Sequence, residues 1–207
     1  MTHRPIRFGF HGSGVLAQRI IAAAGHDPAR FELSQYDPSD PFRRLRRGEL
    51  DVMIVKFTVA EPDLDIGPVL ATDARAAVLS ARHPLAGRAD LSIEDVAGYP
   101  LFQRPGAMPE SVWDQVVPRT TPSGRALRRA YRAESVREML ELVARTEALH
   151  LSVASLADIA PPAIRVIPIH DLPPAPVALA WRRHMVTSQL RDFLAATRPV
   201  ESCRAEL

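Results

Sequence analysis

Short apolar runs alternate with amphipathic segments along the whole chain. The runs are rich in Val, Ile, Leu, Phe and Ala and have the length and period of β-strands. Helical patterns lie between most of them, and such alternation predicts an α/β fold in which helices pack against sheets. We expect strands at Ile6–His11, Phe31–Tyr36, Val52–Phe57, Ala76–Ala81, Pro100–Gln103, Arg129–Ala133, Leu149–Val153, Ile164–Ile169 and Val177–Trp181.

Polar residues mark the start of several expected helices. Ser13 precedes an apolar helical segment, where a serine oxygen can accept a hydrogen bond from the first turn. Ser135 and Glu138 have the spacing of a capping box, and so do Ser155 and Asp158. We therefore expect helices to begin at these three serines.

The composition is that of an ordinary globular protein. Of the 207 residues, 46% are hydrophobic and 24% are charged, which suits one large domain or two small lobes. No apolar run approaches the roughly 20 residues of a membrane span, and the N-terminus lacks the apolar core of a signal peptide. We expect a cytoplasmic protein without membrane contact. Cys203 is the single cysteine, which excludes an internal disulfide and a cysteine-based metal cluster.

The basic residues do not indicate nucleic-acid binding. The formal net charge is only +2, and the acidic residues are interspersed with the basic ones. No zinc finger, recognition helix or RNA-binding aromatic motif is evident. Lys56 stands out because it is the single lysine among 26 basic residues. We interpret one arginine cluster as a solvated helix face that flanks apolar positions: Arg43, Arg44, Arg46 and Arg47, beside Phe42, Leu45 and Leu50.

The loop Gly12-Ser13-Gly14 follows the first expected strand and opens the first expected helix. With the next three residues it matches the dinucleotide-binding pattern G-x-G-x-x-A, and Asp37 stands where a ribose-binding acid could lie. A helix start of this kind also binds other anions, because its backbone N–H groups have no partner within the helix. The loop alone does not distinguish a pyrophosphate from a carboxylate.

No catalytic or metal-binding pattern emerges. The chain has no G-x-S-x-G motif and no H-x-x-x-H or H-E-x-x-H spacing. His11 beside Ser13 is the one pair that could act as base and hydroxyl, but strand alternation sends His11 to the face opposite Phe10. We expect neither an enzyme nor a metal site. The histidines are scattered: His3, His11, His26, His83, His150, His170 and His184.

Three stretches in order carry a resemblance to a known family. They are "PFRRLRRGELDVMIV" (41–55), "VLATDARAAVLSARHPLAGRADLSIEDVAGYPLF" (69–102) and "LELVARTEALHLSVASLADI" (140–159). Together with the loop Pro118–Arg125, they resemble the effector-binding domain of LysR-type transcriptional regulators. The resemblance covers nearly the whole chain. The run that starts at His83, "HPLA", is a marker of the family to which we assign no chemistry.

The resemblance implies an α/β, two-lobed periplasmic-binding-protein-like (type 2) fold with two crossing strands. Lobe I would comprise residues 1–72 and 170–207, and lobe II residues 73–169. A small molecule would bind in the cleft between the lobes. This order of segments disagrees with a single doubly wound dinucleotide-binding sheet, so we expect no cofactor.

The resemblance also has a departure. LysR-type regulators carry an N-terminal winged helix-turn-helix, whereas the first strand here begins at Ile6. We therefore expect a stand-alone effector-binding domain, a shortened relative, or a product whose true start lies upstream. In each case we expect no nucleic-acid binding by this chain itself. It would act in transcription regulation as a homodimer, or as a heterodimer with a full-length LysR-type regulator. The alternative is a binding or biosynthetic protein that reuses the fold without a transcriptional role.

In lobe I the resemblance implies that the first loop and the end of the third strand hold the effector. Ser13 matches a ligand-binding serine, flanked by Gly12 and Gly14, and Lys56 matches a cationic position that pairs with a carboxylate. Phe57 and Thr58 would supply a ring and a hydroxyl. The alternatives are that Ser13 only caps the helix and that Lys56 is a solvated strand-end lysine.

In lobe II the resemblance implies contacts from a loop at Arg104 and from the strand that contains His150, Ser152 and Val153. Core packing or surface placement is the alternative for each of them. Most relatives have a glycine pair before this strand, but this chain has residues 146–149, "TEAL", so the local turn is open. We expect Trp113 and Trp181 to fill the cores of their lobes.

Overall fold

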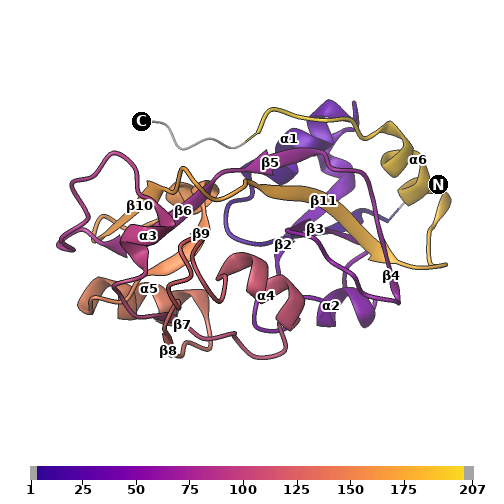
Figure 1. Cartoon of the computed structure of the whole chain (residues 1–207). Coiled ribbons are helices and arrows are strands. Elements are labelled where there is room, and N and C mark those ends of the chain that lie inside the picture. The colour runs from indigo at the N-terminus through magenta and orange to yellow at the C-terminus, as the bar shows by residue number, and fades with distance from the viewer. Residues whose placement is uncertain (1–3, 203–207) are drawn as a thin grey trace. The chain divides into compact units, whose positions relative to one another are not determined.

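The computed structural model describes residues 4–202, and Cys203 lies outside the described residues. Contacts between residues divide the chain into two compact units (Figure 1). Unit 1 comprises residues 4–72 and Pro176–Ser202, and unit 2 comprises Asp73–Ala175. The chain therefore passes from one unit to the other twice.

A mixed sheet with strand order β2-β1-β3-β11-β4 forms the centre of unit 1, and a short strand, β5, also pairs with β11. The first three strands in this order are parallel, whereas β11 is antiparallel to both β3 and β4. The strands are β1 (Ile6–Phe10), β2 (Phe31–Gln35), β3 (Val52–Lys56), β4 (Leu64–Ile66), β5 (Ala71–Asp73) and β11 (Ala175–Arg182).

Helices cover both faces of this sheet (Figure 1). On one face, the Phe193 ring of α6 lies 6.1 Å from the ring of Phe8 and 4.9 Å from that of Phe31, centroid to centroid. On the other face, a Cβ atom at Gly9 would lie 2.6 Å from Leu50, so only glycine lets Leu50 pack this closely on β1. The helices of unit 1 are α1 (Val15–Ala23), the 3-10 helix η1 (Pro28–Arg30), α2 (Arg43–Arg46) and α6 (Ser188–Ala196).

Unit 2 is built on a three-stranded antiparallel sheet with the order β10-β6-β9. Every residue of the central strand, β6, is buried, including Arg75. A separate parallel pair joins β7 to β8. The strands are β6 (Arg75–Ser80), β7 (Leu101–Phe102), β8 (Arg129–Tyr131), β9 (His150–Val153) and β10 (Ile164–Pro168). The helices are α3 (Ile93–Val96), α4 (Glu110–Val116), α5 (Val136–Arg145) and the 3-10 helix η2 (Ala154–Ile159).

The family marker at His83 has a structural role in unit 2. The His83 Nδ1 atom accepts a hydrogen bond of 3.1 Å from the N–H of Leu85, which closes the turn after β6. Its ring packs edge to face on Tyr99 at a centroid distance of 4.5 Å. Burial lowers the pKa of His83, so the neutral imidazole is the form that this turn holds.

The expected strands are all present, and their ends differ from the expected ones by at most two residues. The expected helix start at Ser155 is wrong. Residues 154–159 form the 3-10 helix η2, and the buried N–H of Ser155 donates to Asp73 Oδ1 at 3.1 Å. At the start of α5, the Oγ atom of Ser135 accepts from the N–H of Glu138, as expected. The carboxylate of Glu138, however, accepts from the N–H of Glu134 instead of closing the box.

The interpretation of the arginine cluster around α2 is confirmed. Phe42, Leu45 and Leu50 are buried. Arg46, on the outer face, donates to the carboxylates of Glu61 (2.5 Å) and Asp63 (2.8 Å), so acidic partners neutralise its charge.

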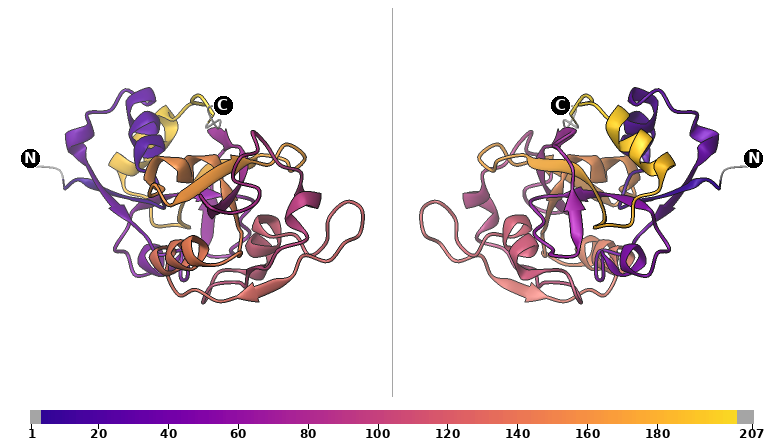
Figure 2. Two further views of the ribbon diagram at one scale, coloured as in Figure 1. Left: turned by 90° about the vertical axis from the view of Figure 1, so that its left-hand side faces the viewer. Right: turned by 90° about the vertical axis from the view of Figure 1, so that its right-hand side faces the viewer.

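The family loop Pro118–Arg125 projects from the body of unit 2 (Figure 2). Its Ser123 donates from N–H and Oγ to the carboxylate of Glu94, which anchors it to α3. None of the helices between residues 4 and 202 has the length and apolar composition to cross a membrane.

Candidate functional site

The carboxyl ends of β1 and β3 form the main candidate site of unit 1. Because these strands are parallel neighbours, their ends meet at the same edge of the sheet. The chain runs from β1 to β2 on one side and returns to β3 on the other, and ligands of open α/β sheets bind at such a switch point. The β1–β3 register pairs Gly9 with Met53, so the loop that follows β1 and Lys56 at the end of β3 lie at the same edge of the sheet.

The loop after β1 depends on its glycines. Gly12 has a φ of 74°, a left-handed conformation that residues with a Cβ rarely adopt. A Cβ atom at Gly14 would lie 3.3 Å from the Phe10 ring. The side-chain amide of Gln35, at the end of β2, donates to the Gly12 carbonyl at 3.0 Å and fixes the loop. Asp37 serves a turn of its own, in which its carboxylate accepts from the N–H of Ser39 at 2.8 Å.

Ser13 lies at this edge with only 8% of its surface exposed. It is not the N-cap of α1, because the helix begins one residue later, with Gly14 as the N-cap. The Oγ atom of Ser13 instead accepts from the N–H of Val15 at 3.2 Å, so that N–H is already satisfied within the loop. Among residues 4–202, the hydroxyl proton of Ser13 has no acceptor. The loop thus offers a donor hydroxyl at the strand edge.

Lys56 ends β3 with a half-buried side chain, and its positive charge acts on His11. Burial of the imidazole and, second, the charge of Lys56 lower the pKa of His11 to about 4. The ring of His11 lies 5.7 Å from that of Tyr36, whose hydroxyl donates to the Ile54 carbonyl at 3.0 Å. A neutral imidazole and a cationic side chain therefore share this edge.

His11 belongs to the candidate site, although strand alternation predicts it on the face opposite Phe10. That alternation does not reach His11, because β1 ends at Phe10. His11 therefore belongs to the loop, and the signal for it was its position directly before Gly12.

Phe57 and Thr58 follow Lys56 at the same edge. Phe57 has a φ of 68°, which is strained for a bulky residue with a Cβ. Its N–H donates to the Pro176 carbonyl at 2.9 Å, which holds this conformation. The side chain of Thr58 is exposed.

In unit 2, only two of the three expected residues of β9 share a face. His150 and Ser152 are half-buried on one face, whereas Val153 is buried on the other, because strand side chains alternate. The His150 ring stacks on Trp113 at a centroid distance of 6.1 Å and meets Phe102 edge to face at 5.7 Å. Trp113 is 4% exposed, which confirms its expected place in the core.

Arg104 is exposed in the loop after β7. Its guanidinium donates to the carbonyl oxygen of Met108 at 2.7 Å and to that of Gly106 at 3.4 Å. Arg104 therefore closes its own loop. Within residues 4–202 no group of three or more His, Cys, Asp or Glu side chains could hold a metal ion.

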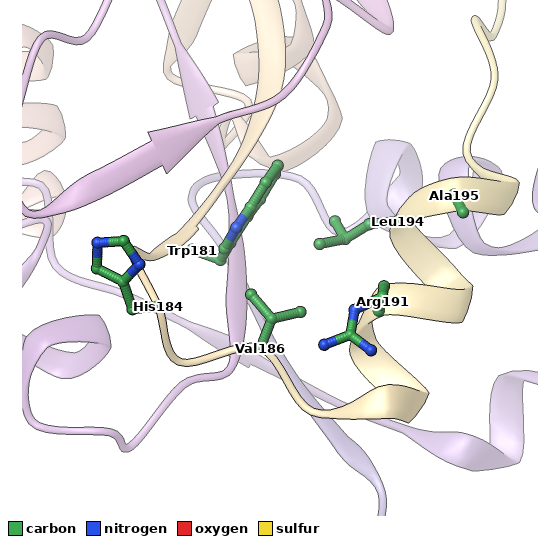
Figure 3. A pocket seen from close by; sticks show the side chains of 6 residues that line it. All are labelled: Trp181, His184, Val186, Arg191, Leu194 and Ala195. Atoms are coloured by element: carbon green, nitrogen blue, oxygen red, sulfur yellow. The ribbon is translucent and has the colours of Figure 1, made fainter.

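Trp181, at the end of β11, differs from the expectation. It is half-buried instead of filling the core, and it lines a pocket beside α6 (Figure 3). None of the predicted site residues lines this pocket.

Solved structures with the same fold are LysR-type proteins. The BenM effector-binding domain with its effector benzoate matches with a TM-score of 0.69 and 20% identity, over 95% of this chain and 91% of that chain. The effector-binding domain of QuiR in complex with shikimate matches with a TM-score of 0.68 and 18% identity, over 94% and 95%. Full-length CbnR complexed with its target DNA matches with a TM-score of 0.70 and 18% identity, over 93% and 69%.

These matches define the class of protein, which has the two-lobed periplasmic-binding-protein-like fold. Residues 6–201 match the family model of the LysR substrate binding domain. The chain belongs to this family, which is regulatory and binds effectors. No curated protein matches the chain.

Proposed function

We propose that this chain is a sensor that binds a small anionic or aromatic metabolite and does not convert it. Membership of an effector-binding family supports this proposal. So do the effectors named for two similar structures, benzoate for BenM and shikimate for QuiR, because both are carboxylates. The observation that carries the proposal is the position of Lys56 at the same sheet edge as the Gly12-Ser13-Gly14 loop, at the β1/β3 switch point.

The lobe I groups have complementary chemistry for a carboxylate. Lys56 supplies the positive charge, and the Ser13 hydroxyl supplies a hydrogen-bond donor. His11 is neutral at pH 7, so it adds a polar contact without a second charge. Phe57 supplies an aromatic surface, and the exposed side chain of Thr58 supplies a hydroxyl. An aromatic or hydroxylated carboxylate fits this set best.

The ligand is proposed to lie in the cleft between lobe I (residues 1–72 and 170–207) and lobe II (residues 73–169). In lobe II, His150 and Ser152 are the groups that we place against it, because they share one face of β9. Arg104 would shape the neighbouring loop, and Val153 would pack behind the strand. No cofactor takes part in this proposal.

The proposed biological role is transcription regulation in the cytoplasm. The chain would act as a homodimer, or as a heterodimer with a full-length LysR-type regulator, and would not contact DNA itself. A binding or biosynthetic role without transcription is the second candidate. Effector-dependent co-purification with a DNA-binding LysR-type regulator from the same cells would support the first role, and an effector that changes no such association would favour the second.

Thermal-shift screening of aromatic and aliphatic carboxylates, followed by calorimetric titration, tests the ligand. We expect a carboxylate to raise the melting temperature and its uncharged amide to have no effect. Lys56→Ala should weaken binding about 10- to 100-fold, because it removes a charge-assisted contact. Arg137→Ala removes an exposed charge from α5 in unit 2 and is the matched control. If no carboxylate stabilises the protein, or if Lys56→Ala binds as tightly as the wild type, the proposal is wrong.

A further inference from the structure

An open pocket of about 450 Å³ lies in unit 1 between the end of β11, the turn that follows it, and α6 (Figure 3). Pockets of a few hundred cubic ångströms suit small organic ligands. Its lining combines apolar and basic side chains: Trp181, His184, Val186, Arg191, Leu194 and Ala195.

The sequence of α6 explains why these side chains face the pocket. Leu190 and Phe193 are the buried residues of α6 and turn toward the sheet. Arg191 and Leu194 are three residues apart, so they lie on one common face of the helix beside the buried one. Thr187 fixes the start of the helix, because its Oγ1 accepts from the N–H of Leu190 at 3.2 Å. The start of α6 and the direction of its buried residues therefore determine which side chains face the pocket.

The indole of Trp181 forms the opposite wall. A Cβ atom at Gly67 would lie 3.2 Å from the Trp181 ring, so the absence of a side chain there leaves room for the ring beside the turn that follows β4. Figure 3 shows Val186, Leu194 and Arg191 on the side of the indole that faces α6. The half-buried ring therefore presents an aromatic surface to the pocket.

The charge of Arg191 is not neutralised within the described part of the chain. No side chain among residues 4–202 hydrogen-bonds to the guanidinium or forms an ion pair with it, and the same holds for the imidazole of His184. Asp192 is next in the helix, but its side chain points about 100° away around the helix axis. Nearby Arg183, by contrast, pairs with Asp65 at 3.0 Å.

We propose that this pocket is a second ligand site, for a small aromatic carboxylate. The aromatic ring would stack on Trp181 between Val186 and Leu194, and the carboxylate would pair with Arg191. His184, held by a turn in which its φ is 62°, places a further donor at the rim. The site shares no residue with the strand-end site of Lys56, and it does not depend on the function proposed above.

Two-dimensional NMR of the 15N-labelled full chain, titrated with 2-naphthoate, tests the proposal. The protein has only two tryptophans, so two indole N–H signals report on the two units. They are assigned with Trp181→Phe. We expect the Trp181 signal to shift in a saturable manner at millimolar probe, because the ion pair is solvent-exposed. The signal of buried Trp113 should stay unchanged by binding at this pocket.

Three variants separate the outcomes. Arg191→Gln should weaken the effect on Trp181 about fivefold, whereas Arg198→Gln, an exposed arginine beyond α6, should not change it. Lys56→Ala should also leave it unchanged, which distinguishes this site from the strand-end site. The proposal is overturned if the Trp181 signal does not move, or if 2-naphthamide or Arg191→Gln gives the same shifts as 2-naphthoate with the wild type.

Discussion

The two units hold a positive charge in different ways. In unit 2, Arg75 is 4% exposed and lies in the central strand of the sheet. Its guanidinium donates to the backbone carbonyls of Gln115 (2.9 Å), Val116 and Ser152 (3.3 Å). The first two carbonyls belong to the last turn of α4, where the helix itself provides no donor. Burial lowers the pKa of Arg75 to about 10, so it stays charged at neutral pH.

In unit 1, the charge of Lys56 lies at a sheet edge. Burial of the neighbouring His11 and, second, this charge disfavour protonation of the imidazole. The next residue, Phe57, is held in a strained backbone conformation. A bound anion would stabilise this combination of a cation, a donor hydroxyl and a neutral imidazole. Backbone carbonyls within unit 2 hold the guanidinium of Arg75, whereas we propose that the cation at the Lys56 edge takes part in binding a ligand. On this proposal, Arg75 is a structural cation and Lys56 is a binding cation.

Replacing Arg75 should give the largest effect on stability. Arg75→Met keeps the apolar stem but leaves buried carbonyls without donors, and we expect a loss of about 3–5 kcal/mol in the free energy of unfolding. For a chain of this size that corresponds to a melting temperature lower by roughly 10 °C. Differential scanning calorimetry measures it.

The control for Arg75 is Arg137→Ala. Arg137 is exposed and pairs with Glu141 one helical turn away, so its loss should change the free energy of unfolding by less than about 0.5 kcal/mol. If both substitutions changed the free energy of unfolding equally, the buried guanidinium of Arg75 would contribute no more to stability than that of an exposed arginine.

Acidification should destabilise the protein through His11. The pKa of His11 is about 4 in the folded chain, whereas an imidazole in the unfolded chain has its ordinary value of 6.5. The unfolded chain therefore binds more protons than the folded chain as the pH falls below 6.5. The stability given by the neutral imidazole is therefore lost between about pH 6.5 and 4, and it amounts to about 2 kcal/mol by pH 5. Urea unfolding at pH 7, 6 and 5 measures this loss.

The variant His11→Gln should show a shallower pH dependence over the same range. His83, whose pKa is also lowered, contributes a remaining slope in the same direction. Equal slopes for His11→Gln and the wild type would contradict the burial of His11 as a neutral imidazole.

The apolar runs of the sequence were sufficient to predict the main strands, because the residues that each strand buries are contiguous or alternating in its own sequence. The short strands β4 and β5 were missed, since each has three residues and is defined by pairing with β11, far along the chain. The role of Arg75 as a donor to backbone carbonyls could not be predicted from the sequence either. Its partners lie 40 to 77 residues away, and nothing distinguishes it in sequence from the other arginines.

The candidate site was partly predictable for a related reason. The glycine loop and the single lysine are visible in the sequence, and the parallel pairing of β1 with β3 is what brings them to the same sheet edge. His11 was missed because one residue decides whether β1 continues or ends. Trp181 was misplaced because composition does not reveal that Gly67 and the register of α6 leave one side of the indole uncovered.

The smallest effect should come from Phe57, and a comparison of two substitutions isolates it. Phe57→Ala and Phe57→Gly both remove the ring, but only alanine retains the Cβ atom that disfavours a φ of 68°. We expect the glycine variant to have the higher free energy of unfolding, by about 1 kcal/mol. At Gln103, which has no positive φ, the order should reverse, because glycine is the more flexible residue in the unfolded chain. Urea unfolding of the four variants measures both differences. If the alanine variant were also the more stable one at position 57, the backbone at Phe57 would not be strained. Backbone strain would then not distinguish the Lys56 edge of unit 1 from unit 2.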